Sequence, residues 1–244
     1  MKLLINFNRC IGLTILLAAF LSLQCSPRKD ADVKQIDKET CKVDHSAPYH
    51  GIDVSHHNGA INWEKVAKNK NIKFVYIKAT EGASHLDSKY HEFFNGAKKV
   101  GLKTGSYHYF RMTSTPRAQF ENIKRNIDKD RQDLIPMIDV ETTDGHSVKE
   151  TRDSLRVLLR MVEKYYGKKP VIYGTNRSYN KICGNTFNNH PLYLGRYGKN
   201  PPVIKGREHY TIWQYSENGK IDGITKPVDL CRFHPDYNLD KILY

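Results

Sequence analysis

Hydrophobic and polar positions follow two alternating patterns along most of the chain. From about residue 49, short apolar runs rich in β-branched and aromatic residues predict strands. Apolar residues at helical spacing fill the earlier gaps, as in residues 88–101 and, behind a capping-box pattern of Ser147 and Glu150, in residues 147–167. The strand-like runs cover residues 49–55, 73–79, 103–110, 134–141, 169–174, 191–198, 210–216 and 226–233.

The order of these segments predicts an α/β fold. Consecutive βα units imply parallel strands, and eight strands suggest a closed barrel. The last few gaps are too short for a full helix, so we expect a single irregular TIM-like β/α barrel with helices mainly between the first five or six strands. A chain of 244 residues suits one such domain, which we place at residues 48–244.

The N-terminal segment has a positive start and one apolar stretch, residues 11–23. This pattern predicts an export signal over residues 1–24, because a membrane span needs about 20 apolar residues. The stretch ends at Cys25 and polar sequence follows at once, so it resembles a bacterial lipoprotein signal with Cys25 as the lipidated residue. Simple secretion and an uncleaved anchor remain open alternatives. We expect the charged residues 25–47 to form a flexible tether.

Polar side chains fall mainly at the ends of the expected strands. In a barrel the carboxyl ends of the strands meet on one face, where catalytic residues usually lie. Asp139 and Glu141 are two residues apart on a strand, so they should project to the same side. The residues concerned are Asp53, Glu81, His108, Asp139, Glu141, Tyr173, Arg196, Gln214 and Asp229.

Four acids would share this barrel mouth: Asp53, Asp139, Glu141 and Asp229. Crowded carboxyl groups cannot all ionise cheaply, so at least one should have a raised pKa. A protonated carboxylic acid beside an ionised one can cleave a glycosidic bond, because one protonates the leaving oxygen while the other acts at the anomeric carbon. The clustering therefore favours a glycosidase.

Aromatic residues near the strand ends could offer ring faces to sugars, although any one of them could equally pack in the core. We expect Lys78 to form an ion pair with a neighbouring acid. His56 and His57 follow Asp53 but lack a metal-ligand spacing, so we expect neither a metal nor a cofactor. The aromatic candidates are Tyr76, Tyr107, Tyr109, Tyr173, Trp213 and Tyr215.

The chain is strongly basic, with a formal net charge of +13, and removal of Lys2 and Arg9 with residues 1–24 leaves +11. A basic exported protein suits an anionic partner such as a cell-wall polymer. The charge is spread along the chain and no nucleic-acid-binding motif accompanies it. We therefore expect no nucleic-acid partner.

Cysteine usage adds little. After Cys25 only Cys41, Cys183 and Cys231 remain, at spacings that match no zinc or haem motif. In an oxidising compartment one disulfide could form, and Cys183–Cys231 is the preferred pair because Cys41 lies in the expected tether. Free buried thiols are an equally open alternative.

Seven motifs in order resemble the glycoside hydrolase family 25 lysozymes, the Chalaropsis-type muramidases: GIDVSHHNGAINW, FVYIKATEG, GSYHYF, PMIDVET, VIYG, TIWQYS and VDLCRF. The resemblance spans residues 49–233. It implies an irregular β/α barrel that cleaves the β-1,4 bond between N-acetylmuramic acid and N-acetylglucosamine in peptidoglycan. Cys231, where relatives often carry Asn, and the ending RFHPDYNLDKILY depart from the family pattern and leave the wall near Asp229 uncertain.

The resemblance also implies roles for individual residues. Glu141 matches the general acid, Asp139 the acid that assists at the anomeric centre, and Asp53 and Asp229 two further acids that line the site. The stereochemistry of the family has been argued both ways, and a sequence gives no carboxylate separation. We expect retention of configuration with help from the substrate's N-acetyl group, with inversion as the open alternative. The expected substrate-binding residues are Tyr76, Lys78, Glu81, Tyr107, His108, Tyr109, Tyr173, Arg196, Trp213 and Gln214.

These observations together predict a monomeric muramidase acting on peptidoglycan glycan strands. It would lie in the bacterial cell envelope, periplasmic or at the surface, held to the membrane by a lipid on Cys25, or be secreted. One alternative is a wall-binding lipoprotein on the same barrel that has lost turnover. Another is a structural lipoprotein whose acids only pair with Lys and Arg, which leaves their clustering at strand ends unexplained.

Overall fold

The computed structural model describes residues 41–244. The predicted signal sequence, the lipidation at Cys25 and the tether up to residue 40 lie outside the described residues. Within residues 41–244, no helix combines the length and the apolar character needed to cross a membrane.

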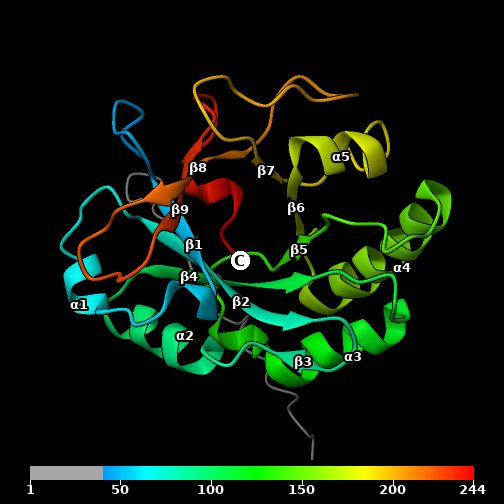
Figure 1. Cartoon of the computed structure of the whole chain (residues 1–244), viewed down its shortest axis with the longest axis horizontal. Helices are drawn as coiled ribbons and strands as arrows, with labels where there is room; N and C mark the ends of the chain where they lie inside the picture. Colours follow the sequence, from blue (N-terminus) through cyan, green and yellow to red (C-terminus); the bar gives the residue numbers. More distant parts are fainter. Residues whose placement is uncertain (1–40) are drawn as a thin grey trace, which may run out of the picture. The chain divides into compact units, whose positions relative to one another are not determined.

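Eight strands close into a barrel, as the sequence predicts (Figure 1). The sheet order is β1-β9-β8-β7-β6-β5-β4-β2-β3, and pairing of β1 with β2 closes the ring and leaves β3 outside it. The strands are β1 Gly51–Val54, β2 Phe74–Glu81, β3 His85–Leu86, β4 Lys103–Tyr109, β5 Met137–Asp139, β6 Val171–Thr175, β7 Leu192–Gly195, β8 Ile212–Gly219 and β9 Val228–Phe233. Strand β3 was not predicted, because it has only two residues.

The last strand runs against the others. Strands β1, β2 and β4 to β8 are parallel, whereas β9 is antiparallel to both β8 and β1. The connection from Gly219 to Val228 is too short for a crossover helix, so the chain returns as a hairpin. Asp229 consequently lies near the N-terminal end of its strand, not at the carboxyl end that the sequence analysis assumed, and still faces the mouth.

Helices fill the early connections on the outside of the barrel (Figure 1). They are α1 Trp63–Val66, α2 Tyr90–Lys99, α3 Pro116–Asn126, α4 Val148–Tyr166 and α5 Asn176–Ile182, with 3-10 turns η1 His56–Asn58, η2 Lys129–Arg131 and η3 Leu239–Lys241. The predicted capping box of Ser147 and Glu150 opens α4, and Gly167 closes it in the left-handed conformation. Helix α5 was not predicted, because its seven residues carry little apolar periodicity.

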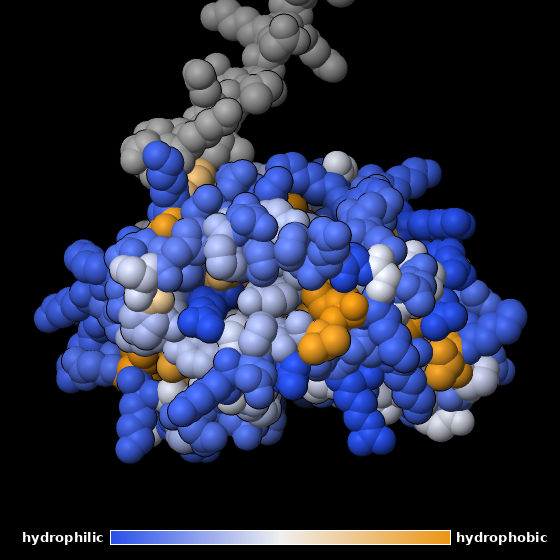
Figure 2. Space-filling model, turned by 90° about the horizontal axis from the view of Figure 1, so that it is seen from above, coloured by the Kyte–Doolittle hydropathy of each residue, from blue (hydrophilic) through white to orange (hydrophobic). Residues whose placement is uncertain are grey.

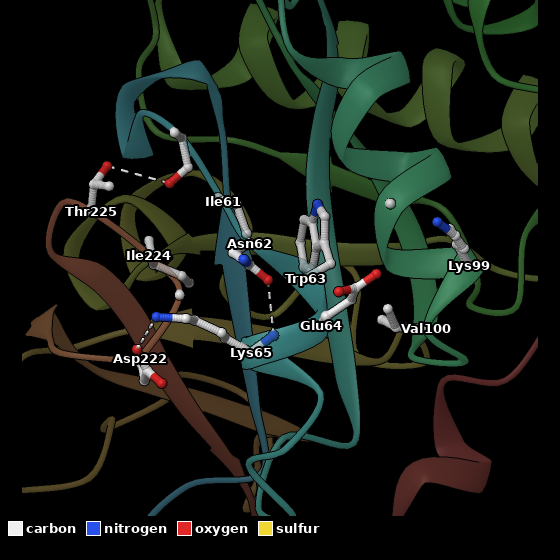
Figure 3. A pocket seen from close by; sticks show the side chains of 13 residues that line it. Ile61, Asn62, Trp63, Glu64, Lys65, Lys99, Val100, Asp222, Ile224 and Thr225 are labelled. Atoms are coloured by element: carbon white, nitrogen blue, oxygen red, sulfur yellow. Dashed lines mark hydrogen bonds and ion pairs between the residues drawn. The ribbon is translucent and has the colours of Figure 1, made fainter.

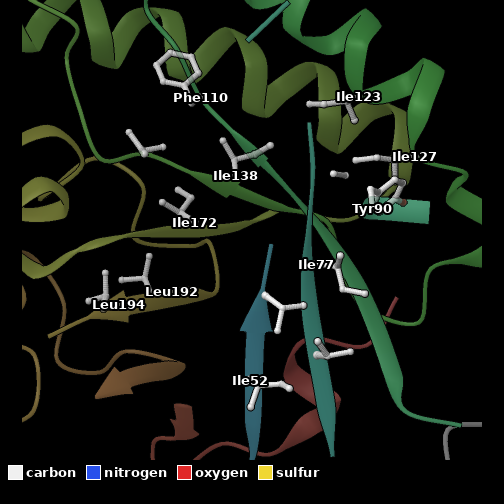
Figure 4. Packing of buried hydrophobic residues seen from close by; sticks show 14 of the residues in the cluster. Ile52, Ile77, Tyr90, Phe110, Ile123, Ile127, Ile138, Ile172, Leu192 and Leu194 are labelled. Carbon is white, nitrogen blue, oxygen red and sulfur yellow. The ribbon is translucent and has the colours of Figure 1, made fainter. Parts of the chain in front are cut away.

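Strand side chains alternate between two apolar layers. One layer packs between the barrel and its helices, where Ile77 and Ile138 meet Ile123 and Phe110 (Figure 4). The other lies inside the barrel and includes Phe74 and the rings of inward-facing tyrosines. The filled interior closes the barrel below the mouth.

The cysteines correct one expectation. Cys41, Cys183 and Cys231 are all free and buried. Cys183 lies in the outer apolar layer, whereas Cys231 lies inside the barrel, so the wall of the barrel separates the preferred disulfide pair. Of the two alternatives, the structure supports free buried thiols.

The start of the folded body also differs from the expected tether boundary at residue 47. Cys41 and Val43 are buried in the inner apolar layer. The backbone N–H of Val43 donates to Asn238, and that of Leu239 donates to the Cys41 carbonyl. Residues 41–43 are therefore part of the base of the barrel, since an unpacked tether would not bury them.

Most of the surface is hydrophilic. Figure 2 shows one face on which hydrophobic residues form only small, separate patches. Among the described residues, the exposed large hydrophobic side chains are Val157, Tyr197 and Val203. Of these, only Tyr197 lines a pocket that also contains the acids.

Candidate active site

A cavity of about 140 Å³ opens at the mouth of the barrel. Residues from seven of the eight barrel strands or the segments that follow them surround it, and all four acids from the sequence analysis are among them. The lining consists of Asp53, Tyr107, Met137, Asp139, Glu141, Tyr173, Tyr197, Gln214 and Asp229. The pocket is polar because the inward positions at this end carry carboxyl, amide and phenol groups.

Asp53 and Asp229 form one carboxyl pair. They face each other as register partners on the antiparallel strands β1 and β9, and their side chains hydrogen-bond. Asp53 Oδ2 also accepts from Tyr193 at 2.6 Å and from Gln214 Nε2 at 3.0 Å. Burial, and then the charge of Asp53, raises the pKa of Asp229 to about 9, and burial also raises the pKa of Asp53. The pair therefore holds one shared proton at neutral pH.

Asp139 is buried at the end of β5, and its Oδ1 has no hydrogen-bond partner. Burial raises its pKa well above the ordinary value, and the charges of Glu141 and Asp53 raise it further. A buried acceptor without a donor costs stability. Asp139 is consequently placed to receive a hydrogen bond from a bound ligand.

Glu141 is the exposed acid of the four. It follows β5 by two residues and stands in the open part of the pocket. Partial desolvation in this concave site, followed by the charge of Asp53, raises its pKa, against the opposing charge of Lys78 and a hydrogen bond from Tyr109. Its carboxyl is thus accessible to a ligand and is shifted toward the protonated form.

A charged network holds Tyr109 next to Glu141. Lys78 and Arg111 lie over the Tyr109 ring at 5.1 and 5.8 Å from its centre. Lys78 pairs with Glu81 at 2.8 Å, and Arg111 pairs with Glu81 at 3.5 Å. Arg111 also contacts Asp144 at 3.2 Å, in the loop that follows Glu141. The network connects β2, β4 and the loop after Glu141 at one side of the mouth.

Among the residues expected to bind substrate, Tyr76, His108 and Trp213 are buried away from the pocket. Tyr76 is fully buried inside the barrel and donates to the Ile135 carbonyl. His108 points outward to Thr80 and Gln119, and burial lowers its pKa to about 4. Trp213 is buried in the outer layer.

Arg196 and Trp213 interact with each other, not with the pocket. The indole N–H of Trp213 donates to the Arg196 carbonyl at 2.6 Å, and the Arg196 guanidinium donates to the Pro201 carbonyl. Neither side chain lines the cavity. Glu81 likewise does not line the cavity and pairs with Lys78 and Arg111 beside it. Tyr107, Tyr173 and Gln214 do line the pocket, and the Tyr173 hydroxyl donates to Gln214 at 2.7 Å.

Tyr197 and Met137 line the pocket but were not predicted from the sequence. Tyr197 follows β7 and is 49% exposed although it lines the pocket, so its ring is open to a ligand. The sequence held a signal for Tyr197, because it lies near the end of the expected strand 191–198, next to Arg196. Met137 faces inward in β5 two residues before Asp139, at the parity that the strand rule predicts.

A larger hollow of about 740 Å³ lies apart from the acids, between α1, α2 and the loop after β8 (Figure 3). It contains the ion pair of Lys65 and Asp222 at 3.6 Å, beside Glu64 and Lys99. Trp63 closes its inner side. Only 7% of its surface is exposed, so little of its ring could contact a sugar. The smaller pocket with the four acids is the better candidate for chemistry.

The pocket suits proton transfer to a bound glycoside. It combines an accessible carboxyl group with a raised pKa, a buried carboxyl with a free oxygen, and a pair that retains a proton. Groups of this kind serve as general acid and as stabilisers of developing positive charge. Among residues 41–244, the one group of three side chains close enough to share a metal ion does not include the four acids, His56 or His57.

Comparison with known proteins agrees with this geometry. The sequence profile of Glycosyl hydrolases family 25 matches residues 52–224. The chain is 34% identical over 197 residues to the uncharacterised protein YegX of Escherichia coli K12, covering 79% of this chain and 72% of YegX. It is 34% identical over 184 residues to the autolytic lysozyme of Clostridium acetobutylicum, covering 75% and 55%. The structure of a family 25 glycosyl hydrolase from Bacillus anthracis superposes with a TM-score of 0.72 and 30% identity, covering 80% and 92%.

Proposed function

Because the chain belongs to Glycosyl hydrolases family 25, we propose that this glycosidase is a muramidase that cleaves peptidoglycan between N-acetylmuramic acid and N-acetylglucosamine. The observation that carries the proposal is the convergence of four acids in one polar pocket, with Glu141 as the accessible member. The autolytic lysozyme among the relatives supports peptidoglycan as the substrate.

Glu141 acts as the general acid. Its raised pKa keeps more of it protonated near neutral pH than an ordinary glutamate, and its exposure lets it reach the oxygen between two sugars. Proton donation allows the C–O bond to break as the leaving sugar takes the proton. The hydrogen bond from Tyr109 then stabilises the carboxylate that remains.

Asp139 acts at the anomeric carbon. Its unpartnered Oδ1 suits a donor such as the N–H of the substrate's N-acetyl group, which would orient the acetyl oxygen toward the reacting carbon. The free carboxyl oxygen of Asp139 is also placed to stabilise the positive charge of an oxocarbenium-like transition state. This arrangement supports retention of configuration by substrate assistance.

The Asp53–Asp229 pair and the aromatic residues position the sugar. A carboxyl pair that keeps one proton offers both a donor and an acceptor to sugar hydroxyls. Tyr197 offers an exposed ring, while Tyr107 and Tyr173 line the inner wall. Lys78 stays in its ion pair with Glu81 and moderates the negative charge of the pocket.

The sequence pattern adds a location to this activity. An export signal with a lipidated Cys25 would hold the barrel at the envelope, where peptidoglycan lies. A basic chain suits the anionic polymers of the wall. We propose a monomer that works without a cofactor, anchored by lipid or secreted.

Product analysis tests the proposal. Purified peptidoglycan is digested, the products are reduced with borohydride, and the new ends are identified by mass spectrometry. A muramidase yields reduced N-acetylmuramic acid. Reduced N-acetylglucosamine would instead indicate a glucosaminidase, and wall binding without new ends would indicate a binding protein that has lost turnover.

A further inference from the structure

Two histidines and an aspartate converge at the end of the barrel opposite the mouth. His209 precedes β8 and His234 follows β9, so the antiparallel pairing of these strands brings them together. Their ring centroids are 4.4 Å apart, and ligand atoms of His209, His234 and Asp236 all lie within 4.8 Å of one another. His234 is five residues from Asp229 along the chain, about 17 Å of extended strand, so this cluster is remote from the acids.

The separations fit a shared metal ion. Asp236 Oδ2 is 3.7 Å from His209 Nε2 and 3.4 Å from His234 Nδ1. Both distances exceed ordinary hydrogen-bond lengths. Around a tetrahedral zinc ion with ligand bonds of about 2.0–2.2 Å, ligand atoms lie about 3.3–3.6 Å apart. Small side-chain rotations would bring the three groups into that geometry.

The donor set also favours a metal over a plain ion pair. Two neutral imidazoles with a carboxylate form a donor set that zinc prefers. The backbone N–H of Asp236 donates to His234 Nδ1 at 3.3 Å, so a metal ion bound at Nδ1 would displace this long hydrogen bond. Glu208, with an oxygen 3.8 Å from His209 Nε2, can supply a fourth ligand.

We propose that His209, His234 and Asp236 bind one zinc ion or a similar divalent transition metal, with Glu208 or water completing the coordination. The site ties the segment before β8 to the segment after β9 at the base of the barrel. His234 anchors it, because its side chain is only 17% exposed and packs beside Tyr210 and Tyr237. The role is structural, since the catalytic pocket lies at the other end of the strands.

Zinc titration of the full chain, prepared without a polyhistidine tag and stripped with EDTA, tests this proposal. Calorimetry should show one zinc ion bound per chain, and zinc at a hundredfold excess over Kd should raise the melting temperature by about 5 °C or more. His234→Ala and His209→Ala should each weaken zinc binding at least tenfold. The same variants without zinc should retain the far-UV circular dichroism of the parent.

His91→Ala is the matched control, because His91 is an exposed histidine on α2 outside the cluster. It should leave zinc affinity unchanged. No binding at 100 µM zinc, or binding that His209→Ala and His234→Ala leave unaltered, would overturn the proposal. Wall hydrolysis should not depend on zinc, so failure of this site and failure of the muramidase proposal give different results.

Discussion

The Asp53–Asp229 pair and the Asp139–Glu141 pair share one pocket but differ in how their oxygens are satisfied. Asp53 receives hydrogen bonds from Tyr193 and Gln214 and contacts Asp229, so the hydrogen-bond partners of this pair come from the protein. Asp139 has a buried oxygen without a partner, and Glu141 is exposed. The difference indicates that the first pair is built to hold position and a proton, and the second to meet the substrate.

Glu141→Gln should give the largest loss of activity. The amide cannot donate a proton to the glycosidic oxygen, and general acid catalysis contributes about 10²–10⁴-fold. We expect turnover on peptidoglycan to fall by about 10³-fold with an unchanged melting temperature, because Glu141 is exposed. Glu121→Gln on the outer helix α3 is the control and should keep full activity. Near-normal turnover of Glu141→Gln would remove this residue from the role of acid.

Asp139→Asn should follow, with an activity loss of about 10²-fold, the scale found when one group that stabilises the transition state is removed. Stability should be unchanged or higher, since the variant no longer buries a carboxyl group whose pKa is raised by burial. Kinetics and thermal melts on the same sample check both parts. Loss of stability together with activity would show that Asp139 serves the fold.

Asp229→Asn should alter the pH dependence of stability. Folding raises the pKa of Asp229 from 3.8 to about 9. The contribution of the protonated Asp229 to the free energy of unfolding is therefore fully present below pH 3.8 and is lost as the pH rises toward 9. The free energy of unfolding should therefore fall with pH between 7 and 9, by at most about 1.4 kcal/mol per pH unit. Denaturant titrations should show this slope in the parent and a flatter one in the variant. Equal slopes would mean that the pair holds no proton.

Tyr197→Ala should have the smallest effect. The exposed ring offers one face to a sugar, and such contacts contribute about 0.5–1.5 kcal/mol. We expect KM to rise by about 2- to 10-fold with little change in kcat. Tyr165→Ala on α4 is an aromatic control away from the pocket. An unchanged KM for the Tyr197 variant would remove this residue from the binding surface.

Local patterns predicted the barrel strands well. Each of the eight is an apolar run bounded by turn residues. Strands of a closed barrel are buried, so their apolar character is visible in the sequence whichever strand lies beside them. The direction of β9 was harder, because it depends on the short connection after Gly219 and not on the strand itself. Helix α5 has only seven residues and strand β3 only two, so neither is long enough to show a clear periodic pattern.

The alternation of side chains along a strand, inward at one residue and outward at the next, explains which residues were wrongly expected to bind substrate. Tyr107 and Tyr109 face the mouth, so His108 between them must face the helices. Gln214 faces the pocket, and the neighbouring Trp213 therefore points outward. Tyr76 has the inward parity but lies one layer below Lys78, and depth along the barrel axis is not readable from a single strand. The four acids converge because all of them face inward near the mouth of the barrel.

The pH dependence of kcat/KM for the parent and Glu141→Gln tests the central claim most directly. A general acid must be protonated, so activity of the parent should fall as pH rises through the pKa of Glu141, which lies above its ordinary value. The residual activity of the variant, followed with a labelled glycan, should lack that descending limb. The same limb in both proteins would contradict the account and assign the proton to another acid of the pocket.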